Sequence, residues 1–314
     1  MIVSVTANTT LDNTVVIPYF EKNRTIRARE TVHSLGGKPT DASWILGEMG
    51  IPSLALGFAA GAVGKKIESM LQARGVTTDF IWVGGESRIN TVIICDDESD
   101  KWATTITTLT LEVNAEHVEA LRRQYAAALD GATCVVIGGT LPVGMQPSFY
   151  TEFIGLAKAR GIPVIFDAAE PNLSAGLAAH PDYVKPNQDE LADFLGRPVS
   201  TLQAAYEAGR GIQAQYGTSP IITLGKDGAL AVLPDRAYFI PPLKVAVVSA
   251  SGAGDGVLAG LAAALSRKQP IEEGLRLAFA AATAVCLQLG TADSRRADIE
   301  RFVPQIELIP YRPT

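Results

Sequence analysis

The chain has 314 residues, a formal net charge of −6 at pH 7 and a hydrophobic fraction of 47%, so it can bury a large core as one α/β domain, alone or with a smaller appendage. Its acidic balance argues against a nucleic-acid-binding surface, and no apolar run reaches the length of a membrane span. Scattered cysteines and histidines indicate neither disulfides nor a metal cluster, and residues 1–6 lack the features of a signal peptide, so we expect a cytoplasmic protein.

The chain begins with a predicted buried strand at residues 2–6, and Asp12 follows at its carboxyl end. Ligands of open α/β sheets bind at such ends, so Asp12 is a candidate for binding substrate hydroxyls. The alternative is an ordinary aspartate in a turn. Residues 14–19 and 25–33 then read as short extended segments outside the main sheet.

A glycine-rich loop comes next, with the sequence Leu35-Gly-Gly-Lys-Pro-Thr-Asp41, and a helix is predicted from it through Met49. Proline fits the first turn of a helix, where its missing N–H is not needed. A glycine-rich loop at a helix start can approach a ligand, so Lys38 is a candidate for binding a phosphate, although most lone lysines are simply solvated.

After a strand at 53–58 and a helix at 63–74, three β-runs at 80–83, 87–95 and 101–107 follow without helices between them. Together with the earlier extended segments they predict a small separate sheet, from about 13–34 and 78–109, that covers the site as a lid. Arg88 and Asn90 lie two apart on one predicted strand and so point to one face, toward substrate or toward solvent.

Helices and strands alternate again from residue 114, which predicts a right-handed, mostly parallel sheet in a three-layer α/β fold. A strand at 182–184 leads to Asn187 and Glu190, which lie three apart at a helix start. They could hold a hydrated magnesium ion or form a capping box. The turn from Thr223 to Gly228 could carry a nucleotide or simply connect two strands.

The stretch that organises the chain follows an apolar, strand-like run at 245–248 and reads Ser249-Ala-Ser-Gly-Ala-Gly-Asp255 before a helix. A helix start of small residues offers free amides to an anion. A carboxylate repels phosphate, so Asp255 makes sense as a base that takes a proton from a hydroxyl. The alternative is a helix-capping aspartate.

These motifs, in this order, resemble those of the ribokinase-like (PfkB) carbohydrate kinases, most closely the hexose-phosphate branch, over residues 3 to about 290. The resemblance rests on five segments: Leu35–Lys38, Gly85–Asn90, Val184–Glu190, Thr223–Gly228 and Gly252–Asp255.

The resemblance implies an ATP-dependent kinase of ribokinase-like fold that phosphorylates the primary hydroxyl of a ketohexose monophosphate and forms a bisphosphate. It also implies Mg²⁺ and a homodimer formed through the lid, with no nucleic-acid or membrane partner.

By the resemblance, the catalytic base is Asp255 with an anion hole at Gly252, Ala253 and Gly254. The sugar phosphate would contact Asp12, Gly37, Asp41 and Arg88, with Lys38 and the partner subunit's Arg27 as further candidates. ATP and its magnesium would contact Lys185, Asn187, Glu190, Thr223, Gly225 and Gly228, with Asn187 and Glu190 holding the metal through water.

Three departures from the family pattern leave the substrate and a monovalent-cation site open. The usual Gly-Gly-Lys-Gly-x-Asn is here Gly-Gly-Lys-Pro39-Thr-Asp41, which removes a backbone donor and replaces an amide with a carboxyl group that, when ionised, only accepts. Ser249-Ala250 stands where many relatives have an acid or Asn followed by Thr, Ser or Pro. A kinase of an unphosphorylated sugar or a nucleoside, or a catalytically idle sugar-phosphate sensor, are the alternatives.

Overall fold

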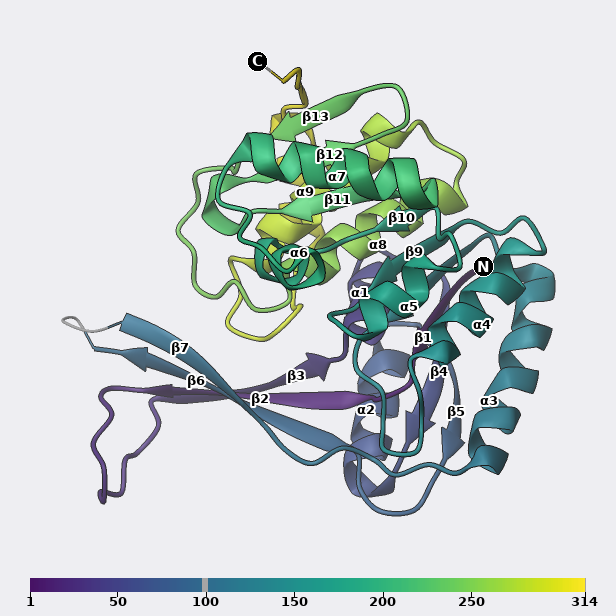
Figure 1. Cartoon of the computed structure of the whole chain (residues 1–314). Helices are drawn as coiled ribbons and strands as arrows, with labels where there is room; N and C mark the ends of the chain where they lie inside the picture. The colour runs from purple at the N-terminus through teal and green to yellow at the C-terminus, as the bar shows by residue number, and fades with distance from the viewer. Residues whose placement is uncertain (98–100, 314) are drawn as a thin grey trace.

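The computed structural model describes residues 1–97 and 101–313 and contains a large sheet of ten strands. Its order is β14-β13-β12-β11-β10-β9-β8-β1-β4-β5 (Figure 1). The strands from β11 to β5 pair in parallel, and those from β11 to β14 pair antiparallel. The mostly parallel sheet predicted from the sequence is thereby confirmed. Its strands are β1 (Ile2–Thr6), β4 (Ser53–Ala59), β5 (Thr77–Trp82), β8 (Cys134–Gly138), β9 (Val164–Asp167), β10 (Tyr183–Val184), β11 (Ser219–Thr223), β12 (Ala229–Val232), β13 (Ala237–Ile240) and β14 (Ile309–Pro310).

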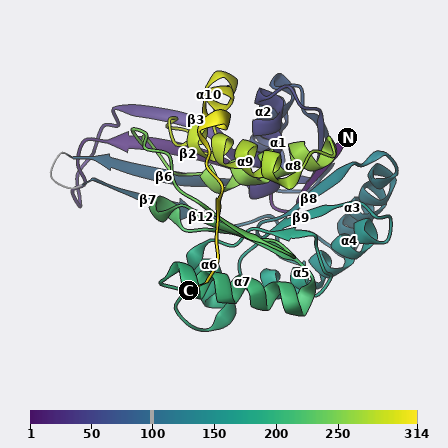
Figure 2. The ribbon, with the colours of Figure 1, turned by 90° about the horizontal axis from the view of Figure 1, so that it is seen from above.

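Helices cover both faces of this sheet, because alternate residues of its buried strands face opposite ways (Figure 2). On β1, for example, Ile2 packs with one group of helices and Val3 with the other. The first group contains α1 (Lys38–Glu48), α8 (Ala253–Ser266), α9 (Ile271–Val285) and α10 (Arg296–Phe302), and α2 (Gly61–Ala73) packs beside it. The second group contains α3 (Ala115–Ala128), α4 (Ser148–Lys158), α5 (Asn172–Leu177), α6 (Gln188–Leu195) and α7 (Leu202–Tyr216).

A second, four-stranded sheet projects from the body of the molecule (Figure 1). Its strands are β2 (Thr10–Ile17), β3 (Glu30–Gly36), β6 (Arg88–Asp96) and β7 (Lys101–Thr107). They lie in the order β3-β2-β6-β7, and the central pair β2 and β6 is parallel. The small sheet predicted from the sequence is therefore present, formed by residues 10–36 and 88–107.

Two predictions of strands are wrong. Residues 80–83 were expected in the small sheet, but β5 pairs with β4 at the edge of the large one. The run at 245–248 is not a strand, and Val247 and Val248 are exposed. Pro241 and Pro242 follow β13 directly, and because proline has no N–H to donate, the ladder ends there.

Within the described residues, no helix combines the length and the apolar character that crossing a bilayer requires.

Candidate functional site

A cavity of about 240 Å³ opens beside the carboxyl ends of β1, β8 and β9, where ligands of such sheets bind. It brings together five of the predicted site residues, Gly37, Lys38, Asp41, Arg88 and Glu190. The rest of its wall, which sequence reasoning did not assign, comes from Thr6, Asn8, Gly139, Thr140, Ala169, Glu170 and Asn172. Most of these follow directly on a buried parallel strand, and that placement is the signal that could have identified them.

The glycine-rich loop positions two of these side chains through the start of α1. The helix begins at Lys38 with Gly37 as its N-cap, at a φ of 104° that favours glycine, and with proline in the first turn as predicted. Asp41 donates its amide to the Gly37 carbonyl oxygen at 3.1 Å, which closes that turn. Lys38 and Asp41 lie three apart on one face of the helix, so both reach the cavity.

An ion-pair network joins Lys38 to the neighbouring strands. Lys38 Nζ lies 2.6 Å from Asp167 Oδ1 and 2.7 Å from Glu190 Oε1, and Lys185 Nζ lies 2.8 Å from Asp167 Oδ2. Burial alone would raise the pKa of Asp167, but Lys185 and Lys38 hold it below its ordinary value. Burial would lower the pKa of Lys38, and the two carboxylates instead raise it. Both groups therefore stay charged at neutral pH.

Sequence reasoning did not assign Asp167 to the site, although the residue ends the buried parallel strand β9. Lys185 follows the neighbouring strand β10, so the two meet at one edge of the sheet. An acidic residue at the carboxyl end of a buried parallel strand is the sequence feature that could have identified Asp167 as a site residue.

The loop before α8 has the helix-start geometry predicted for it. Gly252 is the N-cap with a φ of 80°, and a Cβ atom on it would lie 2.2 Å from the Ala292 amide nitrogen. The amides of Ala253 and Asp255 donate to the carbonyl oxygens of Ala250 and Gly252. In the part of the chain that is described, the amides of Gly252 and Gly254 have no such backbone partner, so these two are the donors available to an anion. The Ala253 amide, also expected in the anion hole, is already bonded to the Ala250 carbonyl oxygen.

Asp255 lies in the first turn of α8 and is 8% exposed. Its carboxyl group lies against that of Asp41, which lines the cavity, although Asp255 does not line it directly. Burial, followed by the charge of Asp167, raises the pKa of Asp255 to about 7, while Lys185 and Lys38 oppose that rise. A carboxyl group with a pKa near neutrality is suited to take up a proton during a reaction.

Gly254 brings this loop next to the lysine of the neighbouring strand. A Cβ atom on Gly254 would lie 3.1 Å from Lys185 Nζ. An anion held by the Gly254 amide would therefore lie close to a buried positive charge.

The small sheet contributes Asp12 and Arg88 from its two central strands. Asp12 lies within β2, not in the connection after β1 as the sequence suggested, and its Oδ1 accepts a hydrogen bond from Asn90 Nδ2 at 2.9 Å. Burial raises the pKa of Asp12, while Thr291, Asn90 and Arg88 oppose the rise. Arg88 donates from Nε to Thr10 Oγ1 at 3.1 Å, which holds its guanidinium beside the cavity.

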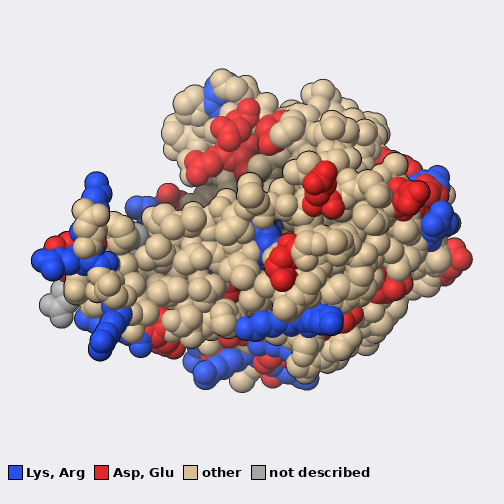
Figure 3. All heavy atoms as spheres, turned by 90° about the horizontal axis from the view of Figure 1, so that it is seen from below, with Lys and Arg blue, Asp and Glu red and all other residues tan. Residues whose placement is uncertain are grey.

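Arg27 does not join this group. It is exposed on the connection between β2 and β3, at the far end of the small sheet (Figure 1). Basic side chains gather on that end of the molecule, at the left of Figure 3. The exposed basic residues of this connection are Lys22, Arg24, Arg27 and Arg29.

The two segments predicted to bind a nucleotide lie side by side. Asn187 pairs with Thr223 in an isolated parallel bridge, and the Thr223 amide donates to the Pro186 carbonyl oxygen at 3.1 Å. The following turn, which contains Gly225 and Gly228, connects β11 to β12.

The capping-box interpretation of Asn187 and Glu190 is confirmed. Asn187 Oδ1 accepts from the Glu190 amide at 2.8 Å, and Glu190 Oε2 accepts from the Asn187 amide at 2.9 Å. Glu190 also keeps its other oxygen on Lys38. Among the described residues, no group of three or more His, Cys, Asp or Glu side chains is arranged to hold a metal ion directly.

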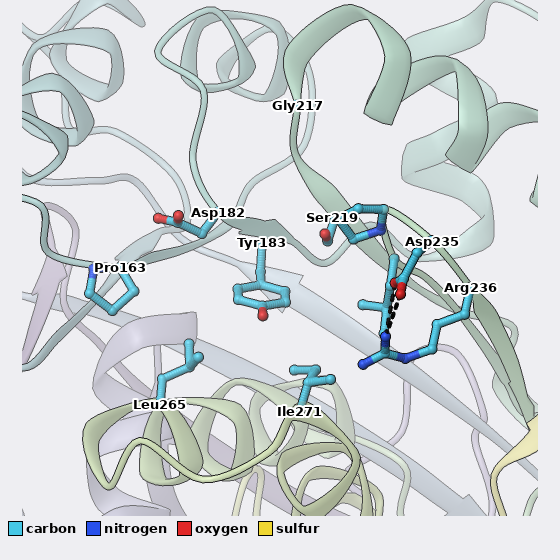
Figure 4. Close-up of a pocket in the computed structure, with 11 residues that line it drawn as sticks. Pro163, Asp182, Tyr183, Gly217, Ser219, Asp235, Arg236, Leu265 and Ile271 are labelled. Atoms are coloured by element: carbon cyan, nitrogen blue, oxygen red, sulfur yellow. Dashed lines mark hydrogen bonds and ion pairs between the residues drawn. The ribbon is translucent and has the colours of Figure 1, made fainter.

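A second cavity, of about 430 Å³, lies at the opposite, amino ends of β9, β10 and β11 (Figure 4). The Tyr183 ring points into it, and Leu265 and Ile271 form one wall. Arg236 is paired with Asp235 and Glu272, and Asp182 is paired with Lys158. Ligands of open α/β sheets bind at the carboxyl ends of the parallel strands, so the smaller cavity, which lies there, is the candidate site.

A family profile, relatives of known name and solved structures all match this chain over most of its length. The profile of the family described as "pfkB family carbohydrate kinase" matches residues 5–298. The 1-phosphofructokinase of Bacillus subtilis (strain 168) is 28% identical over 310 residues, which cover 98% of this chain and 99% of the relative. The tagatose-6-phosphate kinase of Staphylococcus epidermidis (strain ATCC 12228) is 27% identical over 315 residues, covering 98% and 99%. The crystal structure of phosphofructokinase-2 from Escherichia coli in complex with potassium has a TM-score of 0.88 at 25% identity and covers 97% of this chain and 98% of that one.

Proposed function

Because the chain belongs to the pfkB family of carbohydrate kinases, which are ATP-dependent phosphotransferases with an alcohol acceptor, we propose that it phosphorylates the primary hydroxyl of a ketohexose monophosphate and forms a bisphosphate. The observation that carries the proposal is the contact of Asp255 with Asp41, which lines a cavity shared with Lys38 and Arg88. A potential base thus lies beside two cations that suit a phosphorylated acceptor. The names of the relatives, 1-phosphofructokinase and tagatose-6-phosphate kinase, support the same substrate class.

In the proposed reaction, Asp255 accepts the proton of the sugar hydroxyl as the hydroxyl oxygen attacks the γ-phosphate. The free amides of Gly252 and Gly254 at the start of α8 stabilise the negative charge of the transferring group, and Lys185 lies close enough to add a positive charge. Arg88 binds the phosphate that the sugar already carries. Asp12 accepts hydrogen bonds from the hydroxyl groups of the sugar.

The residues on the other side of Lys38 fit ATP with a hydrated magnesium ion. Asn187 and Glu190 offer only oxygen ligands, and because both side chains also cap α6, they are better placed to bind a metal through its waters than directly. Bound ATP would supply the phosphoryl group, and magnesium would offset the negative charge of the phosphate oxygens. Lys185, Thr223, Gly225 and Gly228 would contact the nucleotide from neighbouring strand ends.

The small sheet would act as a lid that excludes water, which otherwise competes with the sugar for the phosphoryl group. Its exposed end carries Arg27 away from the cavity of its own subunit (Figure 1). A homodimer formed through the two lids would bring Arg27 of the partner subunit to the sugar phosphate. In such a dimer Arg27 would bind the sugar phosphate of the partner subunit, which it could not do in a monomer.

A panel of acceptors tests the proposal. ATP turnover is measured with fructose 1-phosphate, fructose 6-phosphate, tagatose 6-phosphate, free hexoses and nucleosides, with an Asp255→Asn variant as the control for contaminating kinases. We expect the highest kcat/KM with a ketohexose phosphate. A preference for a free sugar or a nucleoside would contradict the substrate class, and sugar-phosphate binding without turnover would indicate a sensor.

A further inference from the structure

Asp41 and Asp255 form a pair of facing carboxyl groups. They lie in the first turns of two packed helices, α1 and α8, and are only 2% and 8% exposed. The two groups are in hydrogen-bonding contact. Asp41 Oδ1 is buried, and no N–H or O–H donor in the described part of the chain reaches it. Two buried carboxylates in contact repel each other, so a proton must lie between them for the arrangement to be stable.

The charged neighbours decide which group holds that proton. Asp41 faces the carboxyl groups of Asp255 on α8 and of Asp12 on β2. Burial, and then these charges, raise the pKa of Asp41 well above its ordinary value. Lys185 and Lys38 act on Asp255 and oppose the rise of its pKa.

The other charged groups of the site act mainly elsewhere. Arg88 on β6 acts on Asp12, and Asp167 on β9 acts on Asp255. The cations thus favour the ionised form of Asp255 and leave the protonated form to Asp41.

We propose that Asp41 and Asp255 share a single proton held on Asp41, and that Asp41 is a positioning residue which donates a hydrogen bond to the Asp255 carboxylate and orients it toward the acceptor hydroxyl. A protonated carboxyl group can donate and accept, as an amide can, so it does not repel the sugar phosphate. Loss of the shared proton at high pH would add a second negative charge to the pair and remove this hydrogen bond. The proposal rests on the proposed kinase function for its activity test.

The activity test compares the pH dependence of kcat/KM for the preferred sugar phosphate in wild type and in Asp41→Asn. We expect the wild type to lose activity at alkaline pH, by up to about tenfold per pH unit beyond the second ionisation of the pair. Asparagine donates the same hydrogen bond but cannot ionise, so Asp41→Asn should lack this alkaline limb.

Two further variants serve as controls in the activity test. Asp41→Leu cannot donate, so we expect it to lower kcat/KM at every pH. Asp182→Asn makes the same chemical change at the opposite end of the strands and should keep the alkaline limb. An alkaline limb that is the same in wild type and Asp41→Asn would overturn the proposal.

A second measurement needs no substrate and so separates this proposal from the kinase assignment. Above the ordinary pKa of an aspartate, Asp41 keeps its proton in the folded protein and loses it in the unfolded chain. The folded wild type then binds more protons than the unfolded wild type, so its free energy of unfolding falls as pH rises. The urea midpoint of Asp41→Asn relative to wild type should therefore increase with pH. A difference between the two midpoints that does not change with pH would mean that Asp41 is ionised in the folded protein, and would overturn the proposal even if the kinase activity is confirmed.

Discussion

Replacing Asp255 with asparagine tests the proton transfer at the centre of the proposed reaction. Asparagine keeps the size of the side chain and can still bond to Asp41, but its amide cannot take a proton from the sugar hydroxyl. General-base catalysis contributes roughly 10²–10⁴-fold. At about 1.4 kcal/mol for each tenfold, this corresponds to about 3–5 kcal/mol of activation free energy. We expect Asp255→Asn to lower kcat by this factor.

The pH dependence gives the same prediction a second, independent readout. Because burial raises the pKa of Asp255 to about 7, the free enzyme holds a proton on this base below that pH and loses it above. Wild-type kcat/KM should therefore rise with pH through about 7. Any activity that remains in Asp255→Asn should lack this rise, because the titrating group is gone.

The assay couples ADP release to a spectroscopic signal, and calorimetry measures ATP affinity separately. ATP affinity should stay close to that of wild type, since the hydrogen bonds described for Asn187, Glu190 and Thr223 do not involve Asp255. Asp182→Asn, at the other cavity, is the matched control for folding and should retain the wild-type pH profile. A variant of Asp255 that keeps most of its kcat, with the acid limb unchanged, would refute its role as the base.

Three further variants probe the surroundings of this base. Arg88→Gln should raise KM for the sugar phosphate by about 10–100-fold, through the loss of charge-assisted hydrogen bonds, and leave KM for ATP near wild type in steady-state kinetics. Lys185→Met should lower the urea-unfolding free energy by about 3–5 kcal/mol because it leaves Asp167 buried with one cation fewer, and adding Asp167→Asn should restore part of the loss. Gly252→Ala should lower both the thermal midpoint and kcat, since its Cβ would lie 2.2 Å from Ala292 N at a φ of 80°, and an unchanged midpoint would contradict this geometry.

The sequence predicted best those features that depend on neighbouring residues. The helix starts at Gly37 and Gly252 and the capping box at Asn187 were predictable because each is encoded within one turn of chain. The parallel sheet was predictable because strands and helices alternate along the chain, and this order can be read from local hydrophobic patterns.

Features that depend on distant contacts could not be predicted in this way. Lys38 was considered for the sugar phosphate, yet it pairs with Asp167 and Glu190, because the sheet order brings β9 and the start of α6 beside α1. The facing of Asp41 and Asp255 depends on the packing of α1 against α8 and leaves no local pattern. The run at 245–248 is apolar enough for a strand, but none of the described strands pairs with it.

The carboxyl groups of the site would repel two phosphorylated substrates unless their negative charge is offset. Carboxyl groups outnumber cations around the cavity: Asp12, Asp41, Asp167, Glu170, Glu190 and Asp255 against Lys38, Arg88 and Lys185. Each acid other than the base has a group that can offset its charge or burial. Asn90 bonds to Asp12, the two lysines neutralise Asp167, Ser174 donates two hydrogen bonds to Glu170, Lys38 pairs with Glu190, and a proton serves Asp41. This leaves Asp255 as the single ionised carboxylate available to the acceptor hydroxyl, which is the condition that general-base catalysis beside a phosphate requires.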